Sequence, residues 1–203
     1  TIEHLLSGDK SIEEILIEGP KGIKVLPGGS GVQELANLDV AQLSYVVKNL
    51  GRLERFADIL LIDTGAGLGE VVLNFLMAAD DVILVTTREP TAITDAYGLL
   101  KTLLSRTQEK NIHVVINRVR SEADARETYE RLDIAVRRFL HGALNFLGWI
   151  YEDPHVGKAV MAQEPIGIKY PDCPANRCIN WIAGSVAGIY LNPPRPAGGI
   201  RGF

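Results

Sequence analysis

Asp63 and the glycines after it are the residues of this chain whose types and spacing best suit chemistry. The stretch DILLIDTGAGLGE ends an apolar run at Asp63 and continues into a turn that contains Gly65, Gly67 and Gly69. A carboxylate at the end of an apolar strand, followed by small residues, suits Mg²⁺ held through water beside a nucleotide phosphate. Glycines in such a loop also let it move with the state of a γ-phosphate. The residues therefore suggest a magnesium and phosphate site.

The residues alone leave a second interpretation of Asp63 open. Its carboxylate can equally cap a helix that begins near Leu68, with the glycines only making the turn. A phosphate loop of the form G-x-x-x-x-G-K-[ST] is absent, because the only Gly-Lys pair, Gly157-Lys158, is followed by alanine. The glycine-rich segment 28–31 has no lysine and is interpreted as a tight turn rather than a phosphate site. The chain thus has a carboxylate suited to Mg²⁺ but no loop that binds phosphate.

Cys173 and Cys178 are the only cysteines and form a C-x4-C pair. So few cysteines suit a reducing compartment better than a disulfide framework. A metal site at this pair needs two further donors, and His155 is the one close candidate. We therefore favour a buried thiol pair at a helix start over a metal centre.

Composition indicates a single globular domain as the default. The 203 residues are 46% hydrophobic and 23% charged. The formal net charge of −4 gives no general attraction to nucleic acid, so we expect no nucleic-acid partner. No window reaches the roughly 18 apolar residues of a membrane span, and the start of the chain lacks a signal-peptide pattern. We expect a cytoplasmic protein whose chain, opening at Thr1 in mid-helix pattern, has a further segment upstream.

Apolar runs of strand length alternate with helical patterns. The predicted strands span 22–27, 58–63, 81–87, 112–119 and, more weakly, 143–151. In all but the first, the residues that would point to either face of the strand are apolar, as in strands that are covered on both faces. The predicted helices span 39–56, 91–104 and 121–140. Asp39 and Ser121 are placed to cap the first and the last of them. The alternation predicts an α/β fold, a mostly parallel sheet with helices on both faces.

The segments that follow the predicted strands are the expected site. In open parallel sheets, ligands bind beyond the carboxyl ends of the strands. The segments that reach this edge by topology are 63–67, 86–90, 117–118 and 152–154. Any binding site should therefore be built from these loops.

Four stretches of the chain resemble the MinD/ParA group of P-loop ATPases. They are ILLIDTGAGLGE, VILVTTREPTAITDAYGLLK, VVINRV and YEDPHVGKAVMAQEPI, in the order and spacing of that family. With the N-terminal stretch IEHLLSGDKSIEEILIEGPKGIKVLPGGSGVQELANL, they most resemble the flagellar-number regulators called FlhG, FleN or YlxH, over nearly the whole chain. That family carries a deviant phosphate loop upstream of these stretches. The resemblance therefore implies a P-loop NTPase fold that lacks its N-terminal strand and phosphate loop here.

The resemblance implies ATP and Mg²⁺ as cofactors. Asp63 matches the Walker B aspartate, which holds Mg²⁺ through water and serves catalysis, and Gly67 matches the second switch glycine. The implied reaction is phosphoryl transfer from ATP to water. Without the phosphate loop, this fragment is expected to be inactive, whereas the intact protein is expected to be an ATPase.

The resemblance also implies an adenine site. Asn117 matches the asparagine that reads the adenine edge, a role that suits an amide with both donor and acceptor atoms. Arg118 is placed to lie over the base. Glu152, Asp153 and Pro154 match the segment that closes over the adenine, often through its backbone. Without the resemblance, Asn117 would be interpreted as a loop residue that caps a turn.

The stretch after the third predicted strand is the implied interface. In the family, this face meets a second subunit or effectors when ATP is bound, so Glu89, Thr91 and Asp95 are interface candidates. Pro90 at a helix start, followed by Thr and Asp, is also ordinary capping chemistry. The sequence does not separate these two interpretations.

Two further surfaces bear on partners. The segment 118–138 carries six arginines, but five acidic residues lie among them, so we predict a salt-bridged helix face rather than a DNA-binding stripe. Residues 1–190 are expected to form the ATPase domain and 191–203 a Pro/Gly-rich linker. The end, GGIRGF, is interpreted as the first turn of the membrane-binding amphipathic helix found in the MinD-like branch.

The expected function is an ATP-binding and ATP-hydrolysing switch that regulates flagellar number or placement. The resemblance implies an ATP-dependent homodimer, partners among flagellar assembly proteins or a signal-recognition-type GTPase, and peripheral contact with the inner face of the cell membrane. The alternatives are a chromosome-partition or cell-division-site ATPase of the same superfamily, a non-catalytic binding scaffold, and a metal-cluster carrier that uses Cys173 and Cys178.

Overall fold

The computed structural model describes residues 2–28 and 40–191. Contacts along the chain form two compact units, Thr1–Ala79 and Asp80–Phe203. Asp39, residues 29–31 and the C-terminal stretch 192–203 lie outside the described residues, so the predictions made for them stay predictions. Each unit has its own buried residues and its own sheet.

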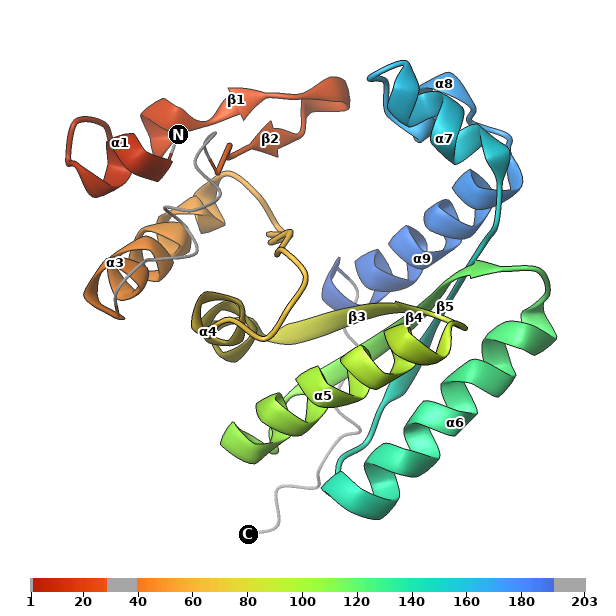
Figure 1. Ribbon diagram of the computed structural model, residues 1–203. Helices are drawn as coiled ribbons and strands as arrows, with labels where there is room; N and C mark the ends of the chain where they lie inside the picture. The colour runs from red at the N-terminus through yellow and green to blue at the C-terminus, as the bar shows by residue number, and fades with distance from the viewer. Residues whose placement is uncertain (1, 29–39, 192–203) are drawn as a thin grey trace, which may run out of the picture. The chain divides into compact units, whose positions relative to one another are not determined.

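The first unit is mostly helical (Figure 1). Its elements are α1 (Ile2–Leu6), η1 (Glu13–Ile15), β1 (Ile17–Glu18), η2 (Pro20–Gly22), β2 (Lys24–Val25), α3 (Val40–Leu50), η3 (Gly51–Arg55) and α4 (Glu70–Ala78). Leu5, Ile12, Ile15 and Leu53 form a small core that joins α1, η1 and η3. Each such buried aliphatic side chain contributes about 1.5–3 kcal/mol of transfer free energy to folding.

A short hairpin replaces the first predicted strand. β1 and β2 pair antiparallel, with Ile17 opposite Val25. Lys21 and Gly22, with φ of 56° and 82°, make the turn between them. The strand predicted over 22–27 is confirmed only at Lys24–Val25, and it does not join the parallel sheet. The connection between β1 and β2 is only a few residues long, and a connection that short can join only antiparallel strands.

The segment 58–63 is not a strand, so that prediction is wrong. It lies between η3 and α4 and pairs with no strand of the described residues. Leu60, Leu61 and Ile62 are 47%, 75% and 39% exposed. An apolar run becomes a strand only where a neighbouring strand satisfies its backbone and other side chains cover it. Within residues 2–28 and 40–191, neither condition is met for this segment.

The helix predicted over 39–56 is confirmed in two parts. α3 covers Val40–Leu50, and the chain then tightens into the 3₁₀ turn η3. Gly51 stands at the change, and glycine is a poor residue for continuing an α-helix. Val46 and Asn49 are buried, and the Asn49 amide donates to the Tyr45 carbonyl at 2.8 Å.

The second unit holds a parallel sheet of strand order β3-β4-β5. Its elements are β3 (Asp81–Thr87), α5 (Pro90–Arg106), β4 (Asn111–Val119), α6 (Glu122–Leu140), β5 (Asn145–Tyr151), α7 (Pro154–Met161), α8 (Ile166–Lys169) and α9 (Pro174–Leu191). β3 and β4 pair in unbroken register from Asp81–Asn111 to Thr87–Asn117. The predicted strands and helices from residue 81 to residue 151 are confirmed, with ends that differ by at most two residues.

Helices lie on both faces of this sheet, as predicted. α5 and α6 lie along one face, and α9 lies against β5 on the other (Figure 1). On β3, Val82 and Leu84 are buried, whereas Ile83 and Val85 are 39% and 55% exposed. The expectation that every such strand is covered on both faces is therefore wrong for β3. The reason is that α9 packs against β5, at the other edge of the sheet.

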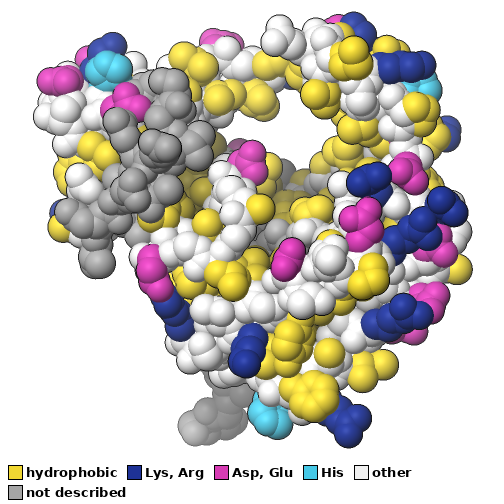
Figure 2. Space-filling view, viewed as in Figure 1, with side chains coloured by type: hydrophobic (Ala, Val, Ile, Leu, Met, Phe, Trp, Pro, Cys, Tyr) yellow, Lys and Arg dark blue, Asp and Glu magenta, His cyan; other side chains and the backbone are white. Residues whose placement is uncertain are grey.

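α6 begins and is stabilised as its sequence predicts. The Ser121 hydroxyl accepts a hydrogen bond from the Asp124 backbone N–H at 3.1 Å, which is an N-cap. Ion pairs one turn apart then follow along the helix: Glu122–Arg126, Glu127–Arg131 and Asp133–Arg137. Basic and acidic side chains are accordingly interleaved on this side of the molecule (Figure 2). The predicted salt-bridged helix face is confirmed.

Among the residues with described positions, no helix combines the length and the apolar character that crossing a membrane requires.

Candidate functional site

Asp63 lies in the connection from η3 to α4, with its side chain exposed. α4 begins at Glu70, its N-cap is Gly69, and no side chain caps it. The alternative interpretation, in which Asp63 caps this helix, is therefore wrong. Gly67 has a φ of 120°, which residues with a side chain rarely adopt. An exposed carboxylate four residues before such a glycine fits a ligand of hydrated Mg²⁺.

The end of β4 forms one side of a second group of candidate residues. Asn117 is the last β4 residue paired with β3, opposite Thr87. Its Oδ1 accepts a hydrogen bond from the Arg118 backbone N–H at 2.9 Å, and Arg118 takes a φ of 56°. This is the turn role that the residues alone suggest for Asn117. Within residues 2–28 and 40–191, its side-chain amide nitrogen donates to no acceptor and so is left for a further one.

Arg118, the second-last residue of β4, connects this strand to the segments that follow β3 and β5. Its Nη2 lies 3.2 Å from Oε1 of Glu152, after β5, and its Nη1 lies 3.7 Å from Oε1 of Glu89, after β3. All three side chains are about half exposed, so each pair contributes only about 0–1 kcal/mol to stability. These ion pairs instead position the Arg118 side chain, because two carboxylates hold its guanidinium at the carboxyl ends of the strands.

The interface candidates lie at the start of α5. Pro90 occupies the first helical position, as the capping interpretation predicts, and Glu89 is the N-cap residue. The Glu89 side chain makes no capping hydrogen bond. Its carboxylate faces Arg118 instead. Thr91 and Asp95 are exposed on the first turns of the helix.

Asp153 is bound by the N-termini of two helices. Its Oδ1 accepts hydrogen bonds from the backbone N–H of His155 at 2.9 Å and from the His155 ring at 2.7 Å. Its Oδ2 accepts one from the backbone N–H of Ala175, in the first turn of α9, at 3.1 Å. The backbone N–H of His155, above all, holds the pKa of this carboxyl far below its usual range. The side chain is 3% exposed, and both of its oxygens accept hydrogen bonds from the protein.

The segment 152–154, which is predicted to close over the adenine, is therefore held in place by the protein. The Glu152 backbone N–H donates to the Val119 carbonyl at 2.9 Å, and Pro154 is the first residue of α7. Because the Asp153 side chain is engaged, a ligand at this segment would meet mainly its backbone and Glu152. This matches the backbone role that the family resemblance implies.

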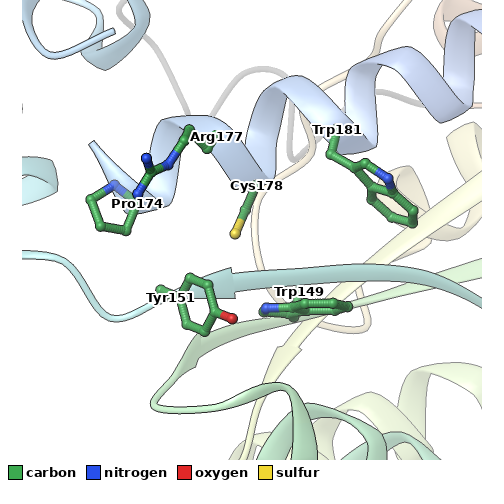
Figure 3. A pocket seen from close by; sticks show the side chains of 6 residues that line it. All are labelled: Trp149, Tyr151, Pro174, Arg177, Cys178 and Trp181. Atoms are coloured by element: carbon green, nitrogen blue, oxygen red, sulfur yellow. The ribbon is translucent and has the colours of Figure 1, made fainter. Parts of the chain in front are cut away.

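The two cysteines do not share one environment. Cys173 is buried directly before α9, where its Sγ accepts a hydrogen bond from the Asn176 backbone N–H at 3.4 Å. Cys178 points from α9 toward Tyr151 and Trp149 of β5 (Figure 3). The sequence prediction of a thiol pair is therefore replaced by two separate thiols, only one of them buried.

An aromatic pocket of about 240 Å³ lies between β5 and α9. Its lining consists of Trp149, Tyr151, Pro174, Arg177, Cys178 and Trp181. Among the described residues, the buried indole N–H of Trp149 has no hydrogen-bond partner. The sequence analysis missed this pocket, although the alternation of Trp149 and Tyr151 on one strand face was a visible signal.

Comparison with known proteins identifies relatives over the whole chain. No family model matches. The chain is 32% identical over 203 residues to the antiactivator FleN of Pseudomonas aeruginosa, covering 100% of this chain and 72% of FleN. It is also 32% identical over 185 residues to the flagellum site-determining protein YlxH of Helicobacter pylori, covering 90% of this chain and 62% of YlxH.

Solved structures agree on the fold. The septum site-determining protein MinD of Pyrococcus horikoshii, in complex with Mg-ADP, matches with a TM-score of 0.74 at 21% identity, covering 97% of this chain and 76% of that one. The cell division ATPase MinD of Pyrococcus furiosus also gives a TM-score of 0.74, at 19% identity over 93% of this chain and 76% of that one. Together with the relatives in sequence, these matches show that the chain belongs to the MinD/ParA superfamily, in the group that contains FleN and YlxH.

Proposed function

We propose that this chain belongs to an ATP-binding and ATP-hydrolysing switch that regulates flagellar number or placement. The flagellar part of the proposal is supported by the 32% identity to FleN and YlxH, one an antiactivator and the other a flagellum site-determining protein. The nucleotide part is supported by membership of the MinD/ParA superfamily and by a neighbour of the same fold that binds Mg-ADP.

The observation that carries the proposal is the meeting of three strand ends at one sheet edge. Arg118, at the end of β4, contacts both Glu89, after β3, and Glu152, after β5. This edge is where open α/β sheets bind nucleotides. In our proposal, the Asn117 amide reads the adenine edge, Arg118 covers the base, and the 152–154 segment closes over it.

Asp63 is proposed to hold Mg²⁺ through water. Its exposed carboxylate and the glycine loop after it fit that role. When bound, Mg²⁺ would neutralise part of the negative charge on the phosphates. Gly67, with its φ of 120°, lets this loop adopt a backbone shape that other residues rarely take.

The proposed partners follow from the same superfamily. We place the dimer or effector surface at the start of α5, where Thr91 and Asp95 are exposed. Binding of ATP is proposed to stabilise a homodimer, and the effectors are proposed to be flagellar assembly proteins or a signal-recognition-type GTPase. The proposed location is the cytoplasm, with peripheral contact on the inner face of the cell membrane.

Two measurements test the proposal. Calorimetry of the 203-residue chain with Mg-ATP tests the nucleotide part of the proposal, because micromolar binding would tell against a pure scaffold. Deletion of the gene, followed by counting flagella and measuring cell length and chromosome number, distinguishes the biological roles. An altered flagellar count with normal division supports the proposal. Normal flagella with misplaced septa or lost chromosomes would contradict it and favour the division-site or partition role.

A further inference from the structure

Three metal-ligand side chains of different chemistry lie together at the start of α7 and α9. They are Asp153, His155 and Cys173, which come from two segments about 20 positions apart in the chain. Their donor atoms, a carboxylate oxygen, an imidazole nitrogen and a thiol sulfur, all lie within 4.8 Å of one another. Asp153 Oδ1 and His155 Nδ1 are 2.7 Å apart.

The protein holds this cluster in a fixed position. The Asp153 side chain is 3% exposed and Cys173 is 7% exposed, whereas the His155 side chain is 39% exposed. Backbone N–H groups from the first turns of α7 and α9 fix the carboxylate. The His155 ring packs against Tyr170, with ring centroids 4.8 Å apart. The cluster is thus closed on the protein side and open to solvent beside the imidazole.

Helix capping alone does not require these residue types. Asp153 already accepts a backbone N–H from the first turn of each helix, and Cys173 adds only a weak N–H···S bond from Asn176 at the start of α9. Immediately before α9, where an N-cap is expected, sulfur is a weak acceptor, and Ser, Thr, Asp or Asn are the usual residues. A thiol and an imidazole that converge on one buried carboxylate are instead the donor set of a zinc site.

We propose that Asp153, His155 and Cys173 bind a zinc ion, with a fourth position open to water beside His155. At the Zn–O, Zn–N and Zn–S bond lengths of tetrahedral sites, ligand atoms lie about 3.3–3.8 Å apart. The observed spacings, from 2.7 Å between Asp153 and His155 to at most 4.8 Å, bracket these distances. One sulfur, one nitrogen and one oxygen favour Zn²⁺ over Mg²⁺ or Ca²⁺, which prefer oxygen ligands alone.

Zinc binding at this cluster releases one proton and needs no other reactant. Zn²⁺ displaces the thiol proton of Cys173, which leaves to solvent, and takes the Nδ1 lone pair of the neutral imidazole, whose proton then resides on Nε2. Asp153 keeps its two backbone hydrogen bonds, because each carboxylate oxygen has a second lone pair. The ion therefore adds to the helix caps rather than replacing them.

Cobalt titration of the 203-residue chain tests this inference independently of nucleotide binding. We expect one Co²⁺ per chain, with a thiolate-to-cobalt absorption band that one equivalent of Zn²⁺ removes. The Cys173→Ser variant keeps a capping hydroxyl, so it should stay folded by circular dichroism. It should nevertheless lose the thiolate band and bind zinc at least tenfold more weakly. Cys178→Ser is the matched control and should leave both measurements unchanged.

A second variant separates metal binding from folding. His155→Ala retains the thiol and should keep a weakened thiolate band, with zinc affinity reduced by about 10–100-fold. Zinc should raise the melting temperature of the unmutated chain more than that of Cys173→Ser at the same zinc concentration. Failure of the unmutated chain to bind cobalt or zinc at equimolar concentration would overturn the proposal. So would equal zinc affinity in Cys173→Ser, or loss of the band in Cys178→Ser instead.

Discussion

The two halves of the predicted nucleotide site differ in how the fold holds them. Around Arg118, the ends of three strands are fixed by strand register, by two ion pairs and by backbone hydrogen bonds. Around Asp63, the backbone pairs with no strand of the described residues, and the apolar side chains before it are exposed. A parallel sheet positions the loops at its strand ends, whereas an unpaired apolar run does not. The second half of the site therefore depends on glycine and carboxylate chemistry more than on packing.

The largest expected effect is at Asp63. In protein expressed from the complete coding sequence, Asp63→Ala should lower Mg²⁺-dependent ATP turnover at least 100-fold, about the loss that follows removal of a group stabilising the transition state. The thermal stability should change little, because the side chain is exposed. A phosphate-release assay measures the turnover. Asp58→Ala, in the same segment, is the control and should remain active. Turnover that survives in Asp63→Ala would refute the magnesium role.

Asp153 should show the largest effect on stability. Asp153→Asn replaces a charged acceptor of several hydrogen bonds by an amide, so we expect a loss of about 2–4 kcal/mol in the free energy of unfolding. Urea denaturation at neutral pH measures it. Asp172→Asn, an exposed neighbour, should change stability by less than about 0.5 kcal/mol. An equal loss in both variants would remove the capping explanation.

The same residue sets a pH dependence with a definite sign. The pKa of the folded Asp153 carboxyl lies far below the unfolded value of about 3.9. Its contribution is therefore complete above that value and is lost as the pH falls below it toward the folded pKa. Acid titration of stability should fall less steeply for Asp153→Asn than for the unmutated chain between about pH 5 and pH 2. Parallel curves would contradict the assignment.

Alanine at two glycines compares the two regions directly. Gly148 of β5 has a φ of 153°, and a Cβ there would lie 2.9 Å from the Trp181 ring. Gly148→Ala should therefore cost about 1–3 kcal/mol through strain and overpacking. At Gly65, in the loop after Asp63, a Cβ would meet no atom within 4 Å, so Gly65→Ala should be close to neutral. Thermal melts of both variants measure the difference. Equal destabilisation would contradict the contrast between the two regions.

The smallest effects on stability are expected at the Arg118 contacts. Arg118→Ala should change the free energy of unfolding by less than about 1 kcal/mol, since its ion pairs are half exposed. Its adenine nucleotide affinity should nevertheless fall about 5–20-fold if the guanidinium covers the base. Arg126→Ala, which removes an ion pair of α6, is the control. Calorimetry should give the same nucleotide affinity for that control as for the unmutated chain. A similar loss of affinity in both variants would tell against the proposal that Arg118 covers the adenine.

Local pattern was sufficient for residues 81–151 of the second unit, but it predicted the bounds of none of the helices α7, α8 and α9, and it failed for much of the first unit. The apolar run at 81–87 and the helix at 121–140 were predicted nearly residue for residue, because the first is a continuous apolar run of strand length and the second carries its period and its N-cap within its own sequence. The run at 58–63 has an equally apolar pattern but no paired neighbour among the described residues. Strand formation depends on a partner strand, which a local pattern cannot supply.

The candidate site divides in the same way. Asn117, Arg118 and Glu152 were placed at one sheet edge from the sequence, because parallel strands carry their loops to the same side. The sequence did not show that Glu89 and Glu152 both contact Arg118, since those contacts depend on side-chain directions. It also did not show that Asp153 caps two helices, one of which begins about 20 residues later.

By itself, the sequence determined the α/β class, the elements from residue 81 to residue 151, the superfamily, and the residue types available for nucleotide and Mg²⁺. Each of these depends on local periodicity or on motifs in a fixed order. Only the tertiary structure decided that Asp153, His155 and Cys173 meet and that Cys178 lies elsewhere, beside Trp149. Contacts between segments distant in the chain follow from how helices and strands pack, and no local pattern encodes that packing.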